Sequence, residues 1–392
     1  MSRELKILSA GAGAGKTYSL SNNIIKSIEN GTLPENVMAT TFTNKAAEEL
    51  MERIRLFLLE KGEHEAAAQV LDGYVGTMNS VFGRLLQEFS LELGLSPVQK
   101  VLSDTEEYVL FSEVTSKVVE KYYFDYGSVF SRLSLDDWPK VVNKIAIQAR
   151  QNKLTSEEVI ACAKYSWETM QSWLPERSEE DAVQLDEKLR AELQEARSYL
   201  PGGDTTKTTK IALDEINNML QKWERNDYIS WRDWAWLARL KTGKNSEDVV
   251  SPIHAAASVH IRHPKLHEDL RIVIEAVFQC AAEALEQYQL AKSKRGLIDF
   301  TDQESIALDL LMDEENSEAL KDRISVVFVD EFQDSSPLQV ALILKLRELV
   351  KQSTWVGDMK QAIYGFRGTD PELMNMLMGT IAENNIEILD KS

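Results

Sequence analysis

The segment that most constrains the fold of this chain is a glycine-rich turn near its beginning, within the sequence LKILSAGAGAGKT of residues 5–17. Apolar residues precede the turn and a helix-compatible segment follows it, so the pattern predicts a strand, a glycine loop and a helix N-terminus. Backbone N–H groups can converge on phosphate oxygens only where the side chains are small. The segment therefore predicts a site for the phosphates of a nucleotide.

Each position of this turn has an expected role. Lys16 would place a positive charge on the β- and γ-phosphates, and the Thr17 hydroxyl would bind Mg²⁺. The positive end of the following helix would face the same anion. Ala10 stands where the strict pattern has glycine, and a chance Gly/Ala-rich turn is the alternative interpretation. The residues expected around the nucleotide are Gly11, Gly13, Ala14, Gly15, Lys16, Thr17 and Tyr18.

Length and composition predict a multidomain protein of a reducing compartment. At about 150 residues per domain, a chain of 392 residues suggests two or three domains, and 43% hydrophobic residues suffice for a core. The two cysteines, Cys162 and Cys280, are far apart, and no apolar run is long enough for a membrane span. We therefore expect a cytoplasmic protein with no membrane partner.

The net charge of −19 argues against a basic nucleic-acid-binding domain. The acidic excess is present in each of the segments 1–92, 93–287 and 288–392. Any contact with nucleic acid must therefore be local, in a groove with its own side chains.

Strands and helices are expected to alternate at both ends of the chain. A predicted strand at 37–42 leads into a polar turn, and a similar unit surrounds residues 76–80. Such turns lie where α/β sheets usually bind their ligands. Between about 95 and 290 the segments look helical, which predicts an all-helical domain inserted between two halves of a parallel sheet.

Tryptophan and arginine residues alternate in one part of this helical block. They could stack on nucleic-acid bases, but large core-filling side chains on a buried helix face are the favoured interpretation. The tryptophans concerned are Trp223, Trp231, Trp234 and Trp236.

Two adjacent carboxylates follow a strongly apolar run. Residues 326–329 read VVFV, as expected for a strand buried on both faces, and Asp330 and Glu331 come next. Burying them is costly unless a cation is present. Beside a nucleotide, Asp330 would hold Mg²⁺, usually through water, and Glu331 would activate the water that attacks the γ-phosphate. A solvated acidic loop is the alternative.

A last strand, 353–357, leads to Gln361, which is placed to sense the γ-phosphate. Tyr364, Phe366 and Arg367 follow, and they offer the π-faces and guanidinium on which single-stranded bases stack. An ordinary aromatic turn is the alternative.

These motifs together resemble those of the superfamily 1A DNA helicases, the UvrD/Rep/PcrA class. Six stretches match in order: AGAGAGKT, TTFTNKAAEEL, GTMNSVFGRLL, LIDFTD, VDEFQD and VGDMKQAIYGFRG. The resemblance implies that ATP and Mg²⁺ are bound by Lys16, Thr17 and Asp330, with Glu331 and Gln361 acting in hydrolysis. It also implies a path for single-stranded DNA lined by Phe42, Asn44, Thr77, Asn79, Tyr364, Phe366 and Arg367.

The resemblance further implies the domain organisation. Residues 1–92 and 290–392 would form one RecA-like P-loop NTPase domain with a parallel sheet, and 93–289 a helical accessory domain that meets the junction of single- and double-stranded DNA. The family's second RecA-like domain, which carries arginine fingers, would lie beyond Ser392. We therefore expect the front part of a 3′-to-5′ translocase and helicase of DNA repair or recombination.

Several departures indicate the RecB/AddA-like branch, whose members act with nuclease or helicase partner subunits. The large insertion is one, and the upstream glutamine motif that reads adenine has no room here. Tyr18 replaces a common arginine, Asn79 a common histidine and Phe366 a common tryptophan. A binding module for nucleotide and single-stranded DNA, without turnover, is the alternative function. A P-loop kinase or transporter ATPase is disfavoured, because Glu331 directly after Asp330 suits water activation and no LSGGQ-like signature is present.

Overall fold

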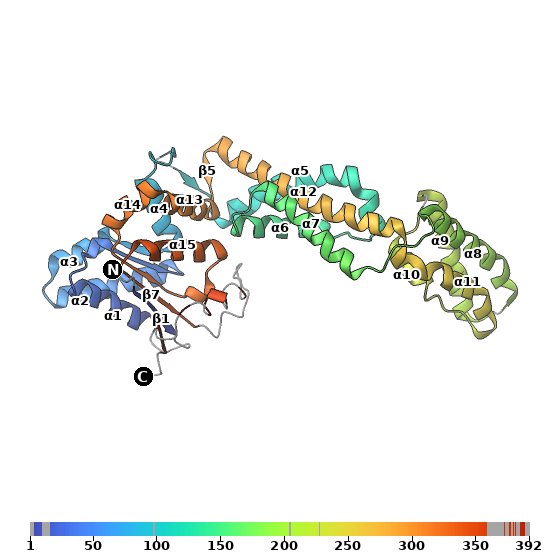
Figure 1. Ribbon diagram of the computed structural model, residues 1–392, viewed down its shortest axis with the longest axis horizontal. Coiled ribbons are helices and arrows are strands. Elements are labelled where there is room, and N and C mark those ends of the chain that lie inside the picture. Colours follow the sequence, from blue (N-terminus) through green and yellow to red (C-terminus); the bar gives the residue numbers. More distant parts are fainter. Residues whose placement is uncertain are drawn as a thin grey trace. The chain divides into compact units, whose positions relative to one another are not determined.

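The computed structural model describes residues 4–9, 16–96, 99–203, 205–226, 228–358, 372, 376–377, 379, 381 and 385–388. It contains two compact units (Figure 1). The sheet unit comprises Met1–Tyr108, Arg150–Lys153 and Lys292–Ser392, and the helical unit comprises Val109–Ala149 and Leu154–Ala291. The domain boundaries drawn from the sequence, at 92/93 and 289/290, stay predictions.

A six-stranded sheet forms the centre of the sheet unit, in the order β3-β2-β6-β7-β1-β8. Neighbouring strands are parallel throughout, and Phe328 of β6 lies between Ala39 of β2 and Thr354 of β7. The α/β class with a parallel sheet, predicted from the sequence, is confirmed. The strands are β1 (Glu4–Ser9), β2 (Val37–Thr41), β3 (Tyr74–Thr77), β6 (Val326–Val329), β7 (Gln352–Gly357) and β8 (Ile386–Ile388).

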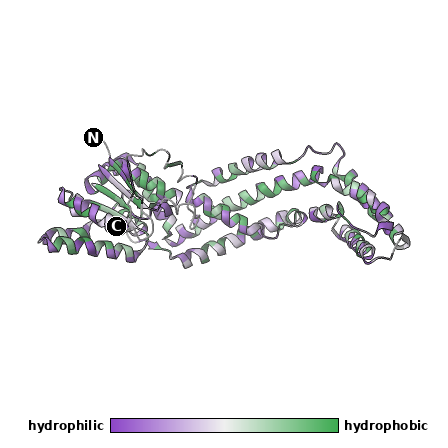
Figure 2. Cartoon of the chain, turned by 90° about the horizontal axis from the view of Figure 1, so that it is seen from below, coloured by the Kyte–Doolittle hydropathy of each residue, from purple (hydrophilic) through white to green (hydrophobic). Residues whose placement is uncertain are grey.

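Helices cover both faces of this sheet, which explains the uninterrupted apolar run of β6. Successive strand residues point to opposite faces. Val327 therefore packs in one core with α4 (Met78–Glu88), α13 (Phe300–Met312), α14 (Glu314–Arg323) and α15 (Pro337–Leu349). Phe328 packs in the other core with α1 (Lys16–Glu29), α2 (Asn44–Glu60) and α3 (His64–Gln69). In Figure 2, green hydrophobic residues occur on the strands of the sheet and on the helices that pack against it.

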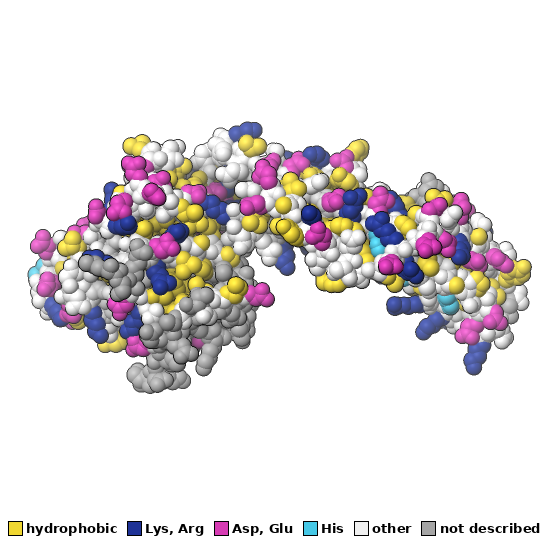
Figure 3. Space-filling model, viewed as in Figure 1, with side chains coloured by type: hydrophobic (Ala, Val, Ile, Leu, Met, Phe, Trp, Pro, Cys, Tyr) yellow, Lys and Arg dark blue, Asp and Glu magenta, His cyan; other side chains and the backbone are white. Residues whose placement is uncertain are grey.

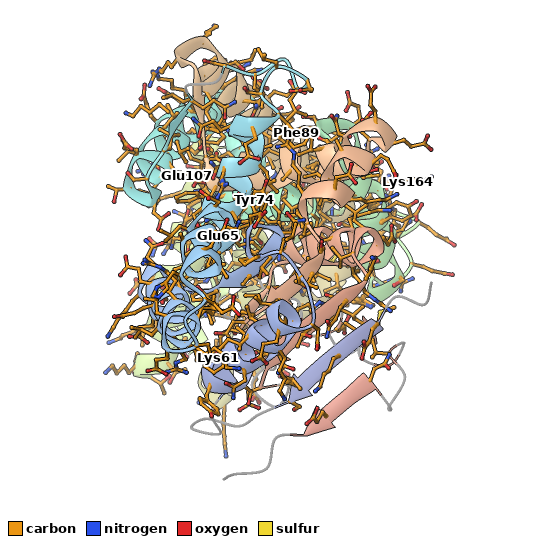
Figure 4. All side chains as sticks on the ribbon, turned by 90° about the vertical axis from the view of Figure 1, so that its left-hand side faces the viewer. Lys61, Glu65, Tyr74, Phe89, Glu107 and Lys164 are labelled. Carbon is orange, nitrogen blue, oxygen red and sulfur yellow. The ribbon has the colours of Figure 1, made fainter. Side chains whose placement is uncertain are left out.

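Figure 4 shows both buried and exposed side chains at one end of the sheet unit. Tyr74 and Phe89 are buried in the core beside α4, whereas Lys61 and Glu65 are exposed on the outer side of α2 and α3. Tyr74 also donates its hydroxyl hydrogen to Glu88.

A buried charge cluster lies beside a short two-stranded sheet of β4 (Lys100–Val101) and β5 (Leu297–Ile298). Lys292 and Asp299 are both fully buried, and Lys292 Nζ lies 2.7 Å from Asp299 Oδ2. Lys292 also contacts Asp302, and Arg150 contacts Asp299. Burial alone would raise the pKa of Asp299, but the two cations hold that pKa below its usual value.

The helical unit buries a core of its own. Trp223, Trp231 and Trp234 are buried in it, which confirms the core-filling interpretation for these three, whereas Trp236 is 39% exposed. In the described part of the chain, no helix combines the length and apolarity needed to cross a membrane. The main helices are α5 (Asp104–Arg132), α6 (Trp138–Gln151), α7 (Ser156–Trp173), α8 (Ala182–Gly203), α9 (Lys207–Asn226), α10 (Trp231–Leu237), α11 (Glu247–Ser258) and α12 (Pro264–Arg295).

We predict that Lys292→Ala lowers the free energy of unfolding by about 3–5 kcal/mol, because it leaves Asp299 without its buried lysine partner. Urea denaturation measures this change. Lys294→Ala, on the exposed side of the same helix, is the matched control and should shift stability by less than about 0.5 kcal/mol. Equal effects of the two substitutions would show that the cluster does not stabilise the fold.

Candidate functional site

The carboxyl edge of the sheet brings together two parts of the chain that are far apart in sequence. Lys16 opens α1 after β1, and Glu331 follows β6. Lys16 Nζ lies 2.7 Å from Glu331 Oε2, although the residues are 315 positions apart. This contact requires the predicted sheet, because only parallel strands deliver both residues to one edge.

The backbone at Glu331 is held in an uncommon conformation. Its φ of 49° and ψ of 43° lie in the left-handed region, which is costly for a residue other than glycine. The Glu331 N–H donates to Asp330 Oδ1 at 3.0 Å, and Gln333 Nε2 donates to Glu331 Oε2 at 2.8 Å. Gln333 Oε1 in turn accepts from the Asp358 N–H at 3.0 Å. The acidic turn is thus fixed against the end of β7.

A cavity of about 340 Å³ opens beside the acidic turn. Burial, and then the neighbouring Glu331 carboxylate, raise the pKa of Asp330 to about 6. The Thr40 hydroxyl oxygen is buried without a hydrogen-bond partner among the described residues. The cavity walls include Thr40, Thr41, Phe42, Thr77, Asn79, Phe300, Asp330, Glu331, Asp334, Ser336 and Gln339.

This donor set fits a hard cation carried by a phosphate ligand. Two adjacent carboxylates with one lysine leave negative charge at a partly buried edge, and carboxylate and hydroxyl oxygens are the groups that Mg²⁺ prefers. Within the described residues, no group of three or more His, Cys, Asp and Glu side chains forms a complete metal site. Mg²⁺ would therefore take its remaining ligands from water and phosphate, as it commonly does.

A larger groove, of about 990 Å³, brings together the predicted strand-contacting residues of the described chain. Phe42, Asn44, Thr77 and Asn79 come from two separate strand-to-helix turns and all line it. Phe42 is 43% exposed. Four residues of the groove, Phe42, Thr77, Asn79 and Phe300, also line the cavity beside Asp330.

Both turns owe their shape to threonine caps. Thr43 accepts from the Ala46 N–H at 3.1 Å at the start of α2, and Thr77 accepts from the Ser80 N–H at 3.2 Å at the start of α4. Each cap satisfies one of the free N–H groups of a helix N-terminus. Residues of both turns line the groove, where the positive ends of the two helices favour anionic groups.

For the other predicted site residues, the structure describes fewer contacts or none. Tyr18 is 62% exposed, with the Arg53 guanidinium 6.0 Å from its ring centre. Thr17 lies in the first turn of α1. The roles of all predicted site residues stay predictions. Eight of them fall outside the described residues: Gly11, Gly13, Ala14, Gly15, Gln361, Tyr364, Phe366 and Arg367.

Sequence reasoning missed three polar residues around the site. Gln333 holds Glu331, and Gln303 lines the groove. Glu304 is buried and accepts from Gln339 Nε2 at 2.6 Å, and burial raises the pKa of Glu304 to about 7. Gln333 stands inside the acidic motif and could have been noticed there, whereas no sequence signal marks Gln303 or Glu304.

A family model and the named relatives that match this chain are all helicases or helicase subunits. The family model described as UvrD/REP helicase N-terminal domain matches residues 2–381. Three relatives are each named as a subunit of an ATP-dependent helicase/nuclease. The relative from Streptococcus uberis is 25% identical over 96% of this chain and 35% of its own length. The relative from Latilactobacillus sakei is 25% identical over 94% of this chain and 48% of its own length. That from Bacillus cereus is 24% identical over 94% of the chain and 34% of the relative. The chain thus spans about a third to a half of their length, and the resemblance inferred from the motifs is confirmed.

We predict that Asp330→Asn stabilises the metal-free protein at neutral pH. Because the pKa of Asp330 is raised from 3.8 to about 6, the wild type loses stability as the pH rises between these values. The amide variant has no such loss. Its free energy of unfolding should therefore exceed that of the wild type by about 1–3 kcal/mol at pH 7 and match it below about pH 4. Thermal unfolding in EDTA across this range measures both. Parallel pH profiles would contradict the burial of this carboxyl.

Proposed function

Because the chain belongs to the UvrD/REP helicase N-terminal domain family, we propose that it forms the ATP- and DNA-binding part of an ATP-dependent DNA helicase. In this proposal the sheet unit is a RecA-like domain and the helical unit is its inserted accessory domain. The observation that carries it is the 2.7 Å contact between Lys16 and Glu331 at the carboxyl edge of the parallel sheet.

The nucleotide site would use the residues of that edge. Lys16 would bind the β- and γ-phosphates, while Thr17 and Asp330 would hold Mg²⁺, which supplies charge neutralisation for the phosphates. Glu331 would orient and deprotonate the attacking water, and Gln361 would sense the γ-phosphate. Since Lys16 contacts Glu331 directly, binding of a phosphate group by Lys16 would release this carboxylate for its role as base.

Single-stranded DNA would occupy the groove of about 990 Å³. The capped starts of α2 and α4 offer N–H groups to phosphates, and Phe42 offers an exposed ring to bases. Figure 3 shows acidic and basic side chains interspersed on the visible face of both units, which supports local contacts over general electrostatic attraction. Tyr364, Phe366 and Arg367 would extend the path.

The properties of the whole protein are part of the proposal. The relatives' names describe subunits with helicase and nuclease functions, which supports action beside a nuclease or helicase partner subunit. For the whole protein we also propose movement in the 3′-to-5′ direction along DNA, a junction of single- and double-stranded DNA as substrate, a second RecA-like domain and a role in DNA repair. The cytoplasmic location stays a prediction.

We expect Lys16→Ala to weaken binding of a fluorescent ATP analogue by about 10- to 100-fold, because a charge-assisted hydrogen bond to phosphate contributes about 1.5–3 kcal/mol. Lys26→Ala, at the other end of α1, is the matched control and should bind as the wild type does. Circular dichroism would establish that both variants are folded. Equal affinity of the Lys16 variant and the wild type would refute the proposed phosphate site.

We further expect ATP hydrolysis to depend on Glu331. Glu331→Gln should retain nucleotide binding but lower the turnover rate by at least about 100-fold, because general-base catalysis contributes about that much. The assay uses the protein with and without single-stranded DNA. Binding without DNA-stimulated turnover in the wild type would favour the binding module that regulates or docks a partner.

A further inference from the structure

One wall of the groove of about 990 Å³ carries amide side chains. Of these, the predicted DNA path includes Asn79 but not Gln87 or Gln303. Asn79, Gly83 and Gln87 follow one another at intervals of four residues on α4, so they share one face of that helix. Gln303 of α13 lines the same groove. The two helices pack against each other within the core on this side of the sheet.

Gln303 combines deep burial with an unsatisfied amide. It is only 5% exposed, yet its Oε1 has no hydrogen-bond partner among the described residues. The Asn79 Oδ1 atom is also buried without a partner in the described chain. Gln333, which is 3% exposed, is by contrast hydrogen-bonded through both ends of its amide. Leaving such groups unpaired is costly, so these two amides point to a ligand that completes them.

A glycine makes room for the buried amide. A Cβ atom at Gly83 would lie 2.9 Å from Gln303 Nε2, closer than carbon and nitrogen normally approach. Glycine in the middle of a helix is unfavourable relative to alanine. A side chain at this position would push the Gln303 amide away from its place beside the groove.

The composition of the wall indicates nucleobases more than phosphates. Glu106 is the charged residue among those that line the groove, and its Oε1 lies 2.9 Å from Lys100 Nζ. No lysine or arginine of the described chain lines the groove. Amides present a donor and an acceptor side by side, which matches the edge of a base, and Phe42 and Phe300 supply rings that match its faces.

We propose that Gln303 and Asn79 hydrogen-bond the edge of an unstacked nucleobase of the single strand that occupies this groove. The inference rests on the proposed function, since it places bases of that strand against the α4 and α13 wall. Phosphates of the same strand would lie toward the helix starts at Thr43 and Thr77. Gln303 would then contribute to affinity only where a base is present.

A thermodynamic cycle tests this directly. Fluorescence anisotropy measures the affinity of wild type and Gln303→Leu for a labelled oligothymidylate and for an abasic strand of equal length. We expect the substitution to weaken binding of the oligothymidylate by about 3- to 10-fold, the effect of one or two hydrogen bonds. On the abasic strand its effect should stay within about twofold, the usual error of such cycles.

Two further variants separate binding from folding. Gly83→Ala should reproduce the base-dependent loss, because its methyl group displaces the Gln303 amide. Gln69→Leu in α3, on the other face of the sheet, is the matched control and should bind both strands as the wild type does. Gln303→Leu should also unfold at the same or a higher temperature, since it removes a buried amide whose Oε1 is unpaired among the described residues.

The outcomes are distinct. Failure of the wild type to bind either strand would overturn the proposed function together with this inference. Binding of the oligothymidylate that is unchanged in Gln303→Leu, or weakened equally on both strands, would overturn the inference alone. A lowered unfolding temperature with unchanged binding would assign Gln303 to the fold and would likewise overturn it.

Discussion

The ion pair between Lys16 and Glu331 depends on almost every other feature of the sheet unit. Its two residues follow β1 and β6, which β7 separates in the sheet, and both strands must be parallel for their carboxyl ends to meet. Parallel strands require helical crossovers and burial on both faces, which the two cores provide. The left-handed backbone at Glu331 is tolerated because Gln333 and the end of β7 hold it in place.

The cavity beside the acidic turn and the larger groove are not independent. Phe42, Thr77, Asn79 and Phe300 line both, so a ligand in either would contact the same side chains. Under the proposed function, this arrangement would give a short physical route between the nucleotide and the single strand, through the turns after β2 and β3. Among the described residues, amides, hydroxyls and helix starts line the groove and no lysine or arginine does. This is compatible with the proposed DNA binding by a chain with a net charge of −19.

Much of this fold could be predicted from the sequence, because its signals are local. The apolar run of β6 and the polar turns after β2 and β3 all depend on neighbouring residues. The proximity of distant segments could be predicted only where motif chemistry required it, as for the glycine turn and the acidic pair around one nucleotide. The direct contact between Lys16 and Glu331 was not predicted. Asp299 stands in the LIDFTD motif, but no periodicity or motif predicts its buried partner Lys292. None marks the amide of Gln303 beside Gly83 or the short strand β8 either, so these features emerge only from the packed structure.

The central claim is that the glycine turn and the acidic pair bind one magnesium–triphosphate group. A crystal structure with Mg²⁺ and a non-hydrolysable ATP analogue tests it most directly. The account predicts the metal between Thr17 and Asp330, with Lys16 Nζ on the phosphates and no longer on Glu331. Triphosphate bound away from Lys16, or metal held by residues other than Thr17 and Asp330, would contradict it.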